Sequence, residues 1–235
     1  MPPSELRIVP VLGLDEIRAG DDVGALVADA AADQQTPVSA GDVVVIAQKI
    51  VSKAEGRLVA VDDRSQVRET VRRQARRIVR ETATQLIVET RHGFVCANAG
   101  VDSSNVDEGH VALLPRDPDA SAVRIRATLE ARTSGPVAVI VADTFGRAWR
   151  LGQTNVAIGS AGIAPLRDHR GEVDPSGRIL NVTEIAQIDE LAAAAELVMG
   201  KLDRVPAAIV RGYPWAVSEG RTTDLVRPAS QDLFR

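Results

Sequence analysis

The chain has 235 residues, of which 45% are hydrophobic, and its formal net charge is −4. This length and apolar content suit one large domain or two small ones, with enough material for a core. The negative charge gives no global field that attracts nucleic acid, and an aromatic content of 3% disfavours stacking platforms for single strands. No apolar segment approaches the roughly 20 residues that span a bilayer, so no membrane partner is expected.

Cysteine content and the N-terminal residues indicate the compartment. Cys96 is the only cysteine, so no disulfide can form within the chain, and a reducing environment is expected. The first ten residues include Glu5 and lack the apolar core of a secretory signal. These features predict a cytoplasmic protein.

The first sixty residues predict three strands and one helix. Residues 6–12 are a short strand candidate, and Pro10 favours an edge position for it. Asp21 or Asp22 can cap a helix that runs to about Ala32. Two further strands are predicted, a buried one over residues 42–50 and a short one over residues 58–61.

A long basic helix is predicted from Asp62 to about Thr82. Its arginines recur at every fourth residue from Arg68 to Arg80. Such a stripe has two interpretations, a docking face for a polyanion or a solvated face opposite an apolar one. The negative net charge favours the solvated face.

The remainder of the chain mixes strands and helices without strict βαβ alternation, which predicts a mixed α/β fold. We treat residues 1–235 as one catalytic unit, with two subdomains as the alternative. The predicted elements are strands at 86–88 and 94–97, a helix at 121–132, a buried strand at 137–142, a hairpin or loop at 168–178, a helix from Thr183 to about Gly200 and a strand at 206–210.

The strand at 137–142 stands out because polar residues follow it at once. Asp143 and Thr144 come directly after its apolar run, and Arg147 and Arg150 follow. Strand ends of this kind can present an acid and a hydroxyl together. The adjacent guanidinium groups suit an anion. This stretch therefore predicts a site for a metal and an anion.

The absence of several common motifs from the sequence excludes the corresponding classes of site. The chain has no GxxxxGK[ST] segment and no GxGxxG after a strand, so neither a P-loop nor a Rossmann fingerprint is present. Its three histidines lack metal-site spacing, and one cysteine cannot build a thiolate zinc site. Oxygen chemistry remains, with candidates at Asp102, Asp143, Thr144, Glu184, Asp189 and Glu190 and cations at Lys49, Lys53, Arg147 and Arg150.

Oxygen ligands of this kind suit Mg²⁺ or Mn²⁺ shared with phosphates. Each candidate also has a purely structural explanation. Asp102 and Asp143 are typical turn or cap residues, the lysines can extend from strand ends, and the arginines can form surface ion pairs. Residue types alone predict an α/β enzyme that handles a metal and a phosphate.

Four ordered segments carry a family resemblance. They are SKAEGR at 52–57, HGFVCANAGVDSSN at 92–105, ADTFGRAWRLGQTNVAIGSAG at 142–162 and TEIAQIDELAAAAELVMG at 183–200, and VRGYPW at 210–215 agrees with them. Over essentially its whole length the chain resembles the coenzyme F420-0:γ-glutamyl ligase family. It is similar to the single-domain form and to the N-terminal ligase domain of the actinobacterial two-domain enzyme.

The resemblance implies a reaction. Members of this family join L-glutamate to the lactyl carboxylate of F420-0 with GTP as co-substrate, and further γ-linked glutamates can follow. The expected path is phosphoryl transfer to the carboxylate, followed by attack of the glutamate amine on the acyl phosphate. The resemblance also implies one or two Mg²⁺ or Mn²⁺ ions, with K⁺ as a further candidate, and an intertwined homodimer with the family's mixed α/β fold.

The resemblance assigns roles to individual residues. It places one metal on Asp102 and Asp143 and a second on Thr144. We assign Arg147 and Arg150 to phosphate charge as catalytic residues together with Asp143. The implied GTP contacts are Leu14, Asp15, Glu16, Ile17, Gln48, Lys49, Lys53, Asn105, Met199, Gly200, Lys201, Leu202, Asp203, Arg204 and Val205.

Some residues depart from the family pattern. Lys201 stands where relatives can carry an acid that serves as a second-metal ligand, so either the second metal does not bind or the lysine replaces its charge. Asn155 stands where an acid is common. Glu184 and Glu190 are six positions apart on the late helix and do not share one stripe, so at most one of them faces the site, and we expect it to be Glu184.

Two alternatives to the GTP-dependent ligase stay open. The first is a related ligase with another acid acceptor or another nucleotide. The second is a non-catalytic module that binds the deazaflavin. The metal-site residues Asp102, Asp143 and Thr144 disfavour the second alternative, because a pure binder has no use for them.

Overall fold

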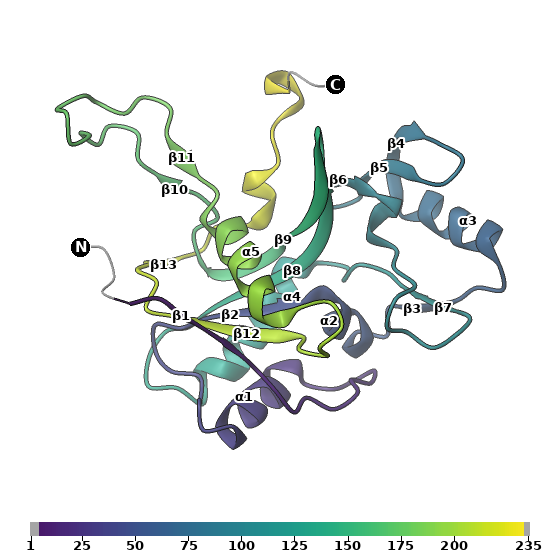
Figure 1. Ribbon diagram of the computed structural model, residues 1–235, viewed down its shortest axis with the longest axis horizontal. Helices are drawn as coiled ribbons and strands as arrows, with labels where there is room; N and C mark the ends of the chain where they lie inside the picture. The colour runs from purple at the N-terminus through teal and green to yellow at the C-terminus, as the bar shows by residue number, and fades with distance from the viewer. Residues whose placement is uncertain (1–4, 233–235) are drawn as a thin grey trace.

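The computed structural model describes residues 5–232, and its centre is a six-stranded sheet. The strand order is β1-β12-β2-β8-β9-β13 (Figure 1). Only the central pair β2–β8 is parallel, and the other neighbours are antiparallel. The strands are β1 (Arg7–Pro10), β12 (Ala207–Arg211), β2 (Val43–Ala47), β8 (Ala138–Arg147), β9 (Arg150–Ile163) and β13 (Val217–Ser218).

Helices cover both faces of this sheet, so its central strands are buried on both sides. Because side chains alternate along a strand, Val44 and Ile46 of β2 pack into one core, and Val43 and Val45 pack into the other. The first core includes α1 (Val23–Asp33), α2 (Gln48–Ala54) and α4 (Pro118–Glu130), and the second includes α5 (Gln187–Met199). The predicted mixed α/β class is confirmed, as are the edge position of β1 and the Asp22 cap of α1.

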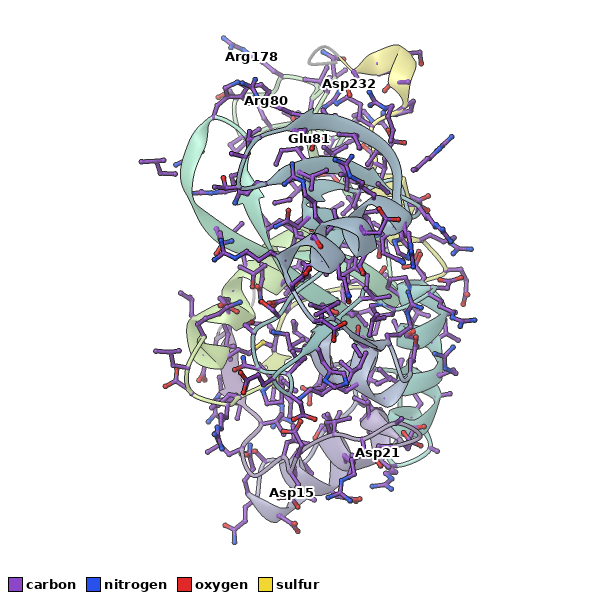
Figure 2. All side chains as sticks on the ribbon, turned by 90° about the vertical axis from the view of Figure 1, so that its right-hand side faces the viewer. Asp15, Asp21, Arg80, Glu81, Arg178 and Asp232 are labelled. Atoms are coloured by element: carbon purple, nitrogen blue, oxygen red, sulfur yellow. The ribbon has the colours of Figure 1, made fainter. Side chains whose placement is uncertain are left out.

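A small lobe, defined as residues 64–100, lies beside the main sheet (Figure 1). It contains α3 (Arg64–Gln74), the sheet β4-β5-β6 (Ala75–Glu81, Leu86–Thr90, Val95–Ala97) and a short 3-10 turn. Its core centres on Val71, Leu86 and Val88. The chain enters and leaves this lobe near the pair β3 (Leu58–Ala60) and β7 (His110–Ala112). Figure 2 shows Arg80 and Glu81 of the lobe at the opposite end of the molecule from Asp15.

The prediction of one long basic helix from Asp62 to Thr82 is wrong. The helix α3 ends at Gln74, and the next residue begins β4, which pairs with β5. The β-branched Ile78 and Val79 favour a strand. The stripe is therefore broken, and its arginines pair with local acids: Arg68 and Arg72 both contact Glu81 at 2.6 Å.

Two other predicted boundaries are corrected. The helix expected from Thr183 begins at Gln187, because Glu184 and Ile185 form β11, which pairs with β10 (Arg167–Asp168). The strand expected over 42–50 ends at Ala47, and α2 follows without a loop. No helix of the described residues has the length and apolar character that a bilayer crossing requires.

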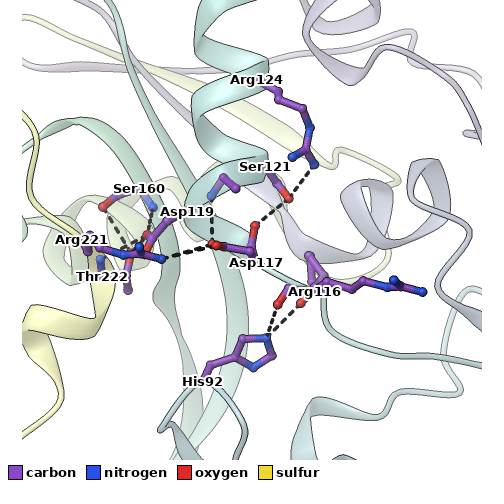
Figure 3. Close-up of polar contacts among 11 residues, drawn as sticks. His92, Arg116, Asp117, Asp119, Ser121, Arg124, Ser160, Arg221 and Thr222 are labelled. Atoms are coloured by element: carbon purple, nitrogen blue, oxygen red, sulfur yellow. Dashed lines mark hydrogen bonds and ion pairs between the residues drawn. The ribbon is translucent and has the colours of Figure 1, made fainter.

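A buried carboxylate fastens the C-terminal segment to the sheet. Asp119, in the first turn of α4, accepts hydrogen bonds from the Ser160 amide at 2.9 Å and from the Thr222 hydroxyl at 2.8 Å (Figure 3). Arg221 adds a contact at 3.3 Å. A buried acid with this many donors is well satisfied, so the polar segment around Thr222 is held at a defined position.

Gly159 allows α4 to approach β9 closely, and we expect Gly159→Ala to destabilise the fold. A Cβ there would lie 2.3 Å from the Pro118 carbonyl oxygen, so backbone must shift, at a cost of about 1–3 kcal/mol. Chemical denaturation of Gly159→Ala and the control Gly146→Ala measures this. Nothing lies within 4 Å of the added Cβ at Gly146, so the control should change by no more than about 0.5 kcal/mol. Equal effects would contradict the packing argument.

Candidate active site

The parallel pair β2–β8 places two strand ends at one edge of the sheet. Their ladder runs from Val43↔Ala138 to Ala47↔Ala142, and the next residues are Gln48 and Asp143. A pocket of about 360 Å³ opens at this edge. Ligands of α/β sheets commonly bind at such carboxyl ends.

Most of the predicted site residues line this pocket. The N-terminal loop, α2, the loop after β6, the end of β8 and the segment after α5 all contribute. The predicted residues in the lining are Leu14, Asp15, Glu16, Ile17, Gln48, Lys49, Lys53, Asp102, Asn105, Asp143, Thr144, Met199, Gly200, Lys201, Arg204 and Val205. Leu202 and Asp203 are not in the lining, although their neighbours are.

Asp102 is held in its charged form by close donors. The Lys49 ammonium lies 2.7 Å from one carboxylate oxygen, and the Ser104 amide donates to the other at 2.7 Å. Burial raises the pKa of Asp102, but the hydrogen bonds from Lys49 and Ser104 outweigh burial, and the net pKa is lowered. An ionised carboxylate is therefore available on this side of the pocket.

Asp143 behaves in the opposite way. Its pKa is raised to about 6, mainly by burial and also by the negative charge of Asp102, although a hydrogen bond from the Thr144 amide at 2.8 Å opposes the rise. Burial, with a contribution from the Asp143 charge, raises the pKa of the Cys96 thiol to about 12, so the thiol is neutral. Two carboxylates that repel each other in a partly buried pocket suit a cation between them.

The donor set fits an ion that is shared with a substrate. The described residues contain no group of three or more His, Cys, Asp or Glu side chains around one point. Asp102 and Asp143 can supply carboxylate oxygens, and Thr144 can supply a hydroxyl. Mg²⁺ is commonly held by one or two carboxylates with phosphate oxygens and water as the other ligands.

A polar chain beside Asp143 includes a residue that the sequence did not single out, Glu196. The Thr144 hydroxyl donates to the Asn155 side-chain oxygen at 2.8 Å, and the Asn155 amide donates to Glu196 at 2.7 Å. Asn155 is 4% exposed. Lys201 lies 3.4 Å from the Thr144 hydroxyl. Only the helical phase of α5, counted back from Met199, could have indicated that Glu196 faces this pocket.

Arg147 and Arg150 do not line the pocket, contrary to their expected position beside the metal. They face each other near the tip of the β8–β9 hairpin, where Arg147 donates to the Leu151 carbonyl at 2.6 Å. β8 continues for four residues past Asp143 at about 3.3 Å each, which carries both arginines away. Glu184 is also outside the lining and pairs with Arg170 at 3.1 Å.

The raised pKa of Asp143 makes a prediction about stability. Its folded pKa of about 6 exceeds an unfolded value of about 3.9. The folded state therefore binds more protons between these values, and stability falls as pH rises from about 4 to about 6, by about 3 kcal/mol at most. Asp143→Asn removes this titration, and the side-chain oxygen still accepts from Thr144.

In metal-free buffer we expect Asp143→Asn to unfold at higher denaturant than the unsubstituted protein at pH 7.5. The two proteins should converge near pH 4. Urea titrations across this range measure the difference in the free energy of unfolding. A difference that does not change with pH would show that burial does not oppose ionisation of Asp143.

Comparison with known proteins identifies the family of this chain. The family described as F420-0:Gamma-glutamyl ligase matches residues 12–212. Three proteins named coenzyme F420:L-glutamate ligase are similar over almost their full length. They come from Methanothermobacter thermautotrophicus (44% identity, 98% of this chain and 99% of the relative), Methanopyrus kandleri (41%, 98% and 98%) and Methanocaldococcus jannaschii (38%, 98% and 98%). The chain therefore belongs to the F420-0:gamma-glutamyl ligase family.

Proposed function

We propose that this protein joins L-glutamate to coenzyme F420-0, with GTP as the source of energy. The observation that carries the proposal is the pocket at the end of the β2–β8 pair, whose lining includes Asp102 and Asp143 together with the cations Lys49, Lys53 and Arg204. Relatives named for glutamate ligation cover nearly the whole chain. The chemistry of the pocket agrees with those names.

Amide formation from a free acid and an amine is uphill in water, so the acid must be activated. In the proposed path an oxygen of the lactyl carboxylate attacks the γ-phosphorus of GTP, and the bond from that phosphorus to the β–γ bridging oxygen breaks. GDP leaves and an acyl phosphate forms. The glutamate nitrogen then attacks the acyl carbon and loses a proton, and inorganic phosphate leaves.

This path needs positioning and charge neutralisation more than a nucleophilic side chain. Lys49, Lys53 and Arg204 line the pocket, and their ammonium and guanidinium groups would bind phosphate oxygens there. Lys53 is held by an ion pair with Glu16 from the N-terminal loop. We assign phosphate charge to these three residues and not to Arg147 and Arg150.

Asp102 and Asp143 would hold Mg²⁺ or Mn²⁺. When bound, that ion would neutralise phosphate charge as it develops. Burial of Asp143 raises the affinity of the pocket for a cation, because a cation removes the cost of its charge. The homodimer implied by the resemblance stays a prediction, which light scattering of the purified protein measures.

Mass spectrometry of F420-0 incubated with the protein, L-glutamate and either GTP or ATP tests the function. We expect a gain of one or more glutamates with GTP and Mg²⁺ or Mn²⁺. The same assay shows which nucleotide is used and how many glutamates are added. No gain with either nucleotide and either metal would contradict the ligase and favour a deazaflavin-binding protein.

Asp143→Asn should lower glutamate addition by more than about 100-fold, because it removes a proposed metal ligand. The matched control is Asp29→Asn, which alters a surface ion pair between Asp29 and Arg132 and should leave turnover unchanged. Circular dichroism verifies that both variants are folded. Normal turnover of Asp143→Asn at saturating Mn²⁺ would overturn the metal assignment.

A further inference from the structure

The hydrogen bonds that link Thr144, Asn155 and Glu196 beside Asp143 all donate in the same direction, from Thr144 toward Glu196. An amide oxygen can only accept, so the hydrogen bond between Thr144 and Asn155 takes its proton from the Thr144 hydroxyl. The Asn155 amide group donates to Glu196, which fixes which end of the amide faces which partner. The lone pairs of the Thr144 oxygen are consequently left for a donor or a cation.

Lys201 provides that cation. Its ammonium nitrogen lies 3.4 Å from the Thr144 oxygen. Lys201, Asp143 and Glu196 all line the same pocket. One ammonium group thus contacts the Thr144 hydroxyl and shares the pocket with two carboxylates.

The backbone around Lys201 favours this position. α5 ends at Met199, and Gly200 follows with φ +60° and ψ 178°. L-residues rarely adopt this backbone conformation, so the turn favours glycine. The turn sets Lys201 just past the C-terminus of α5, where the helix dipole favours positive charge.

A divalent ion and this ammonium compete for the same oxygen. An ion such as Mg²⁺ sits about 2.1 Å from its ligands, so an ion on Thr144 would lie close to the lysine nitrogen and be strongly repelled. Asp102 and Asp143 also line the pocket, and the cation position proposed for them does not require the Thr144 oxygen.

We propose that the Lys201 ammonium is the permanent cation at Thr144 and Glu196, so that the protein binds one divalent ion with its nucleotide instead of two. This inference rests on the proposed function for its nucleotide and deepens it by fixing the number of ions. The lysine performs with a side chain what would otherwise require a second ion from solution.

The test counts Mn²⁺ ions bound per chain by electron paramagnetic resonance during titration. The probe is Mn²⁺ with a non-hydrolysable GTP analogue, and inorganic tripolyphosphate serves as a second probe that does not depend on the base. We expect one Mn²⁺ for the unsubstituted protein and two for Lys201→Met, in which the oxygens of Thr144 and Glu196 are left without a cation. Lys201→Arg keeps the charge and should bind one.

Two Mn²⁺ ions in the unsubstituted protein, or one in Lys201→Met, would overturn the proposal. Lys201 is exposed, and thermal melts of the variants verify that they are folded. The count does not depend on turnover. One bound ion without any glutamate addition would contradict the proposed function and leave the inference about Lys201 supported.

Discussion

The parallel pairing of β2 with β8 is the constraint on which the site depends. The pair is buried on both faces, so its register is fixed by packing in two cores. Two parallel strands in register end together, and Gln48 and Asp143 therefore start at the same edge. The N-terminal loop and the segment after α5 reach the same edge because β12 pairs with β2 and β1 pairs with β12.

The charges at this edge of the sheet lower the stability of the fold and favour the binding of a charged ligand. Asp143 is held where its charge is poorly solvated, and Asp102 beside it stays ionised. Lys49 and Lys201 approach the two carboxylates from different elements and offset part of this repulsion. Sites that bind charged ligands commonly keep such pairs at a cost in stability.

Sequence reasoning predicted most elements of the main sheet, because continuous apolar runs such as 137–142 and 43–47 are typical of buried strands. The prediction failed for residues 75–82, where residues recur at helical spacing although the segment is not helical. The arginine spacing from Arg68 to Arg80 fits a helix, but the partners that decide the outcome, Glu81 and the strand β5, come later in the chain. The start of α5 was misplaced for a similar reason, since β10 is distant in sequence.

The residues of the site can also be separated into those that the sequence predicted and those that it did not. Asp143 and Thr144 could be selected from the chain because they follow a buried strand directly, whereas their partnership with Asp102 and the roles of the N-terminal loop came from family resemblance. Glu196 was missed because its role depends on the face that α5 presents to β9. Arg147 and Arg150 were expected near the metal because they follow Asp143 closely in sequence. The sequence did not show that β8 continues past Asp143 and carries both arginines away from the pocket.

The length of β8 has a mechanical consequence. One unbroken strand carries Asp143 and Thr144 at its base and Arg147 near the hairpin tip, and a bulge interrupts its ladder with β9 just before Asp143, between Val141 and Ala142. The extra residue of this bulge is Ile158 on β9, because Val141 pairs with Gly159 and Ala142 pairs with Ala157. A bulge bends its strand and increases the local twist, so the direction in which the hairpin leaves the sheet is set at the residues that precede Asp143.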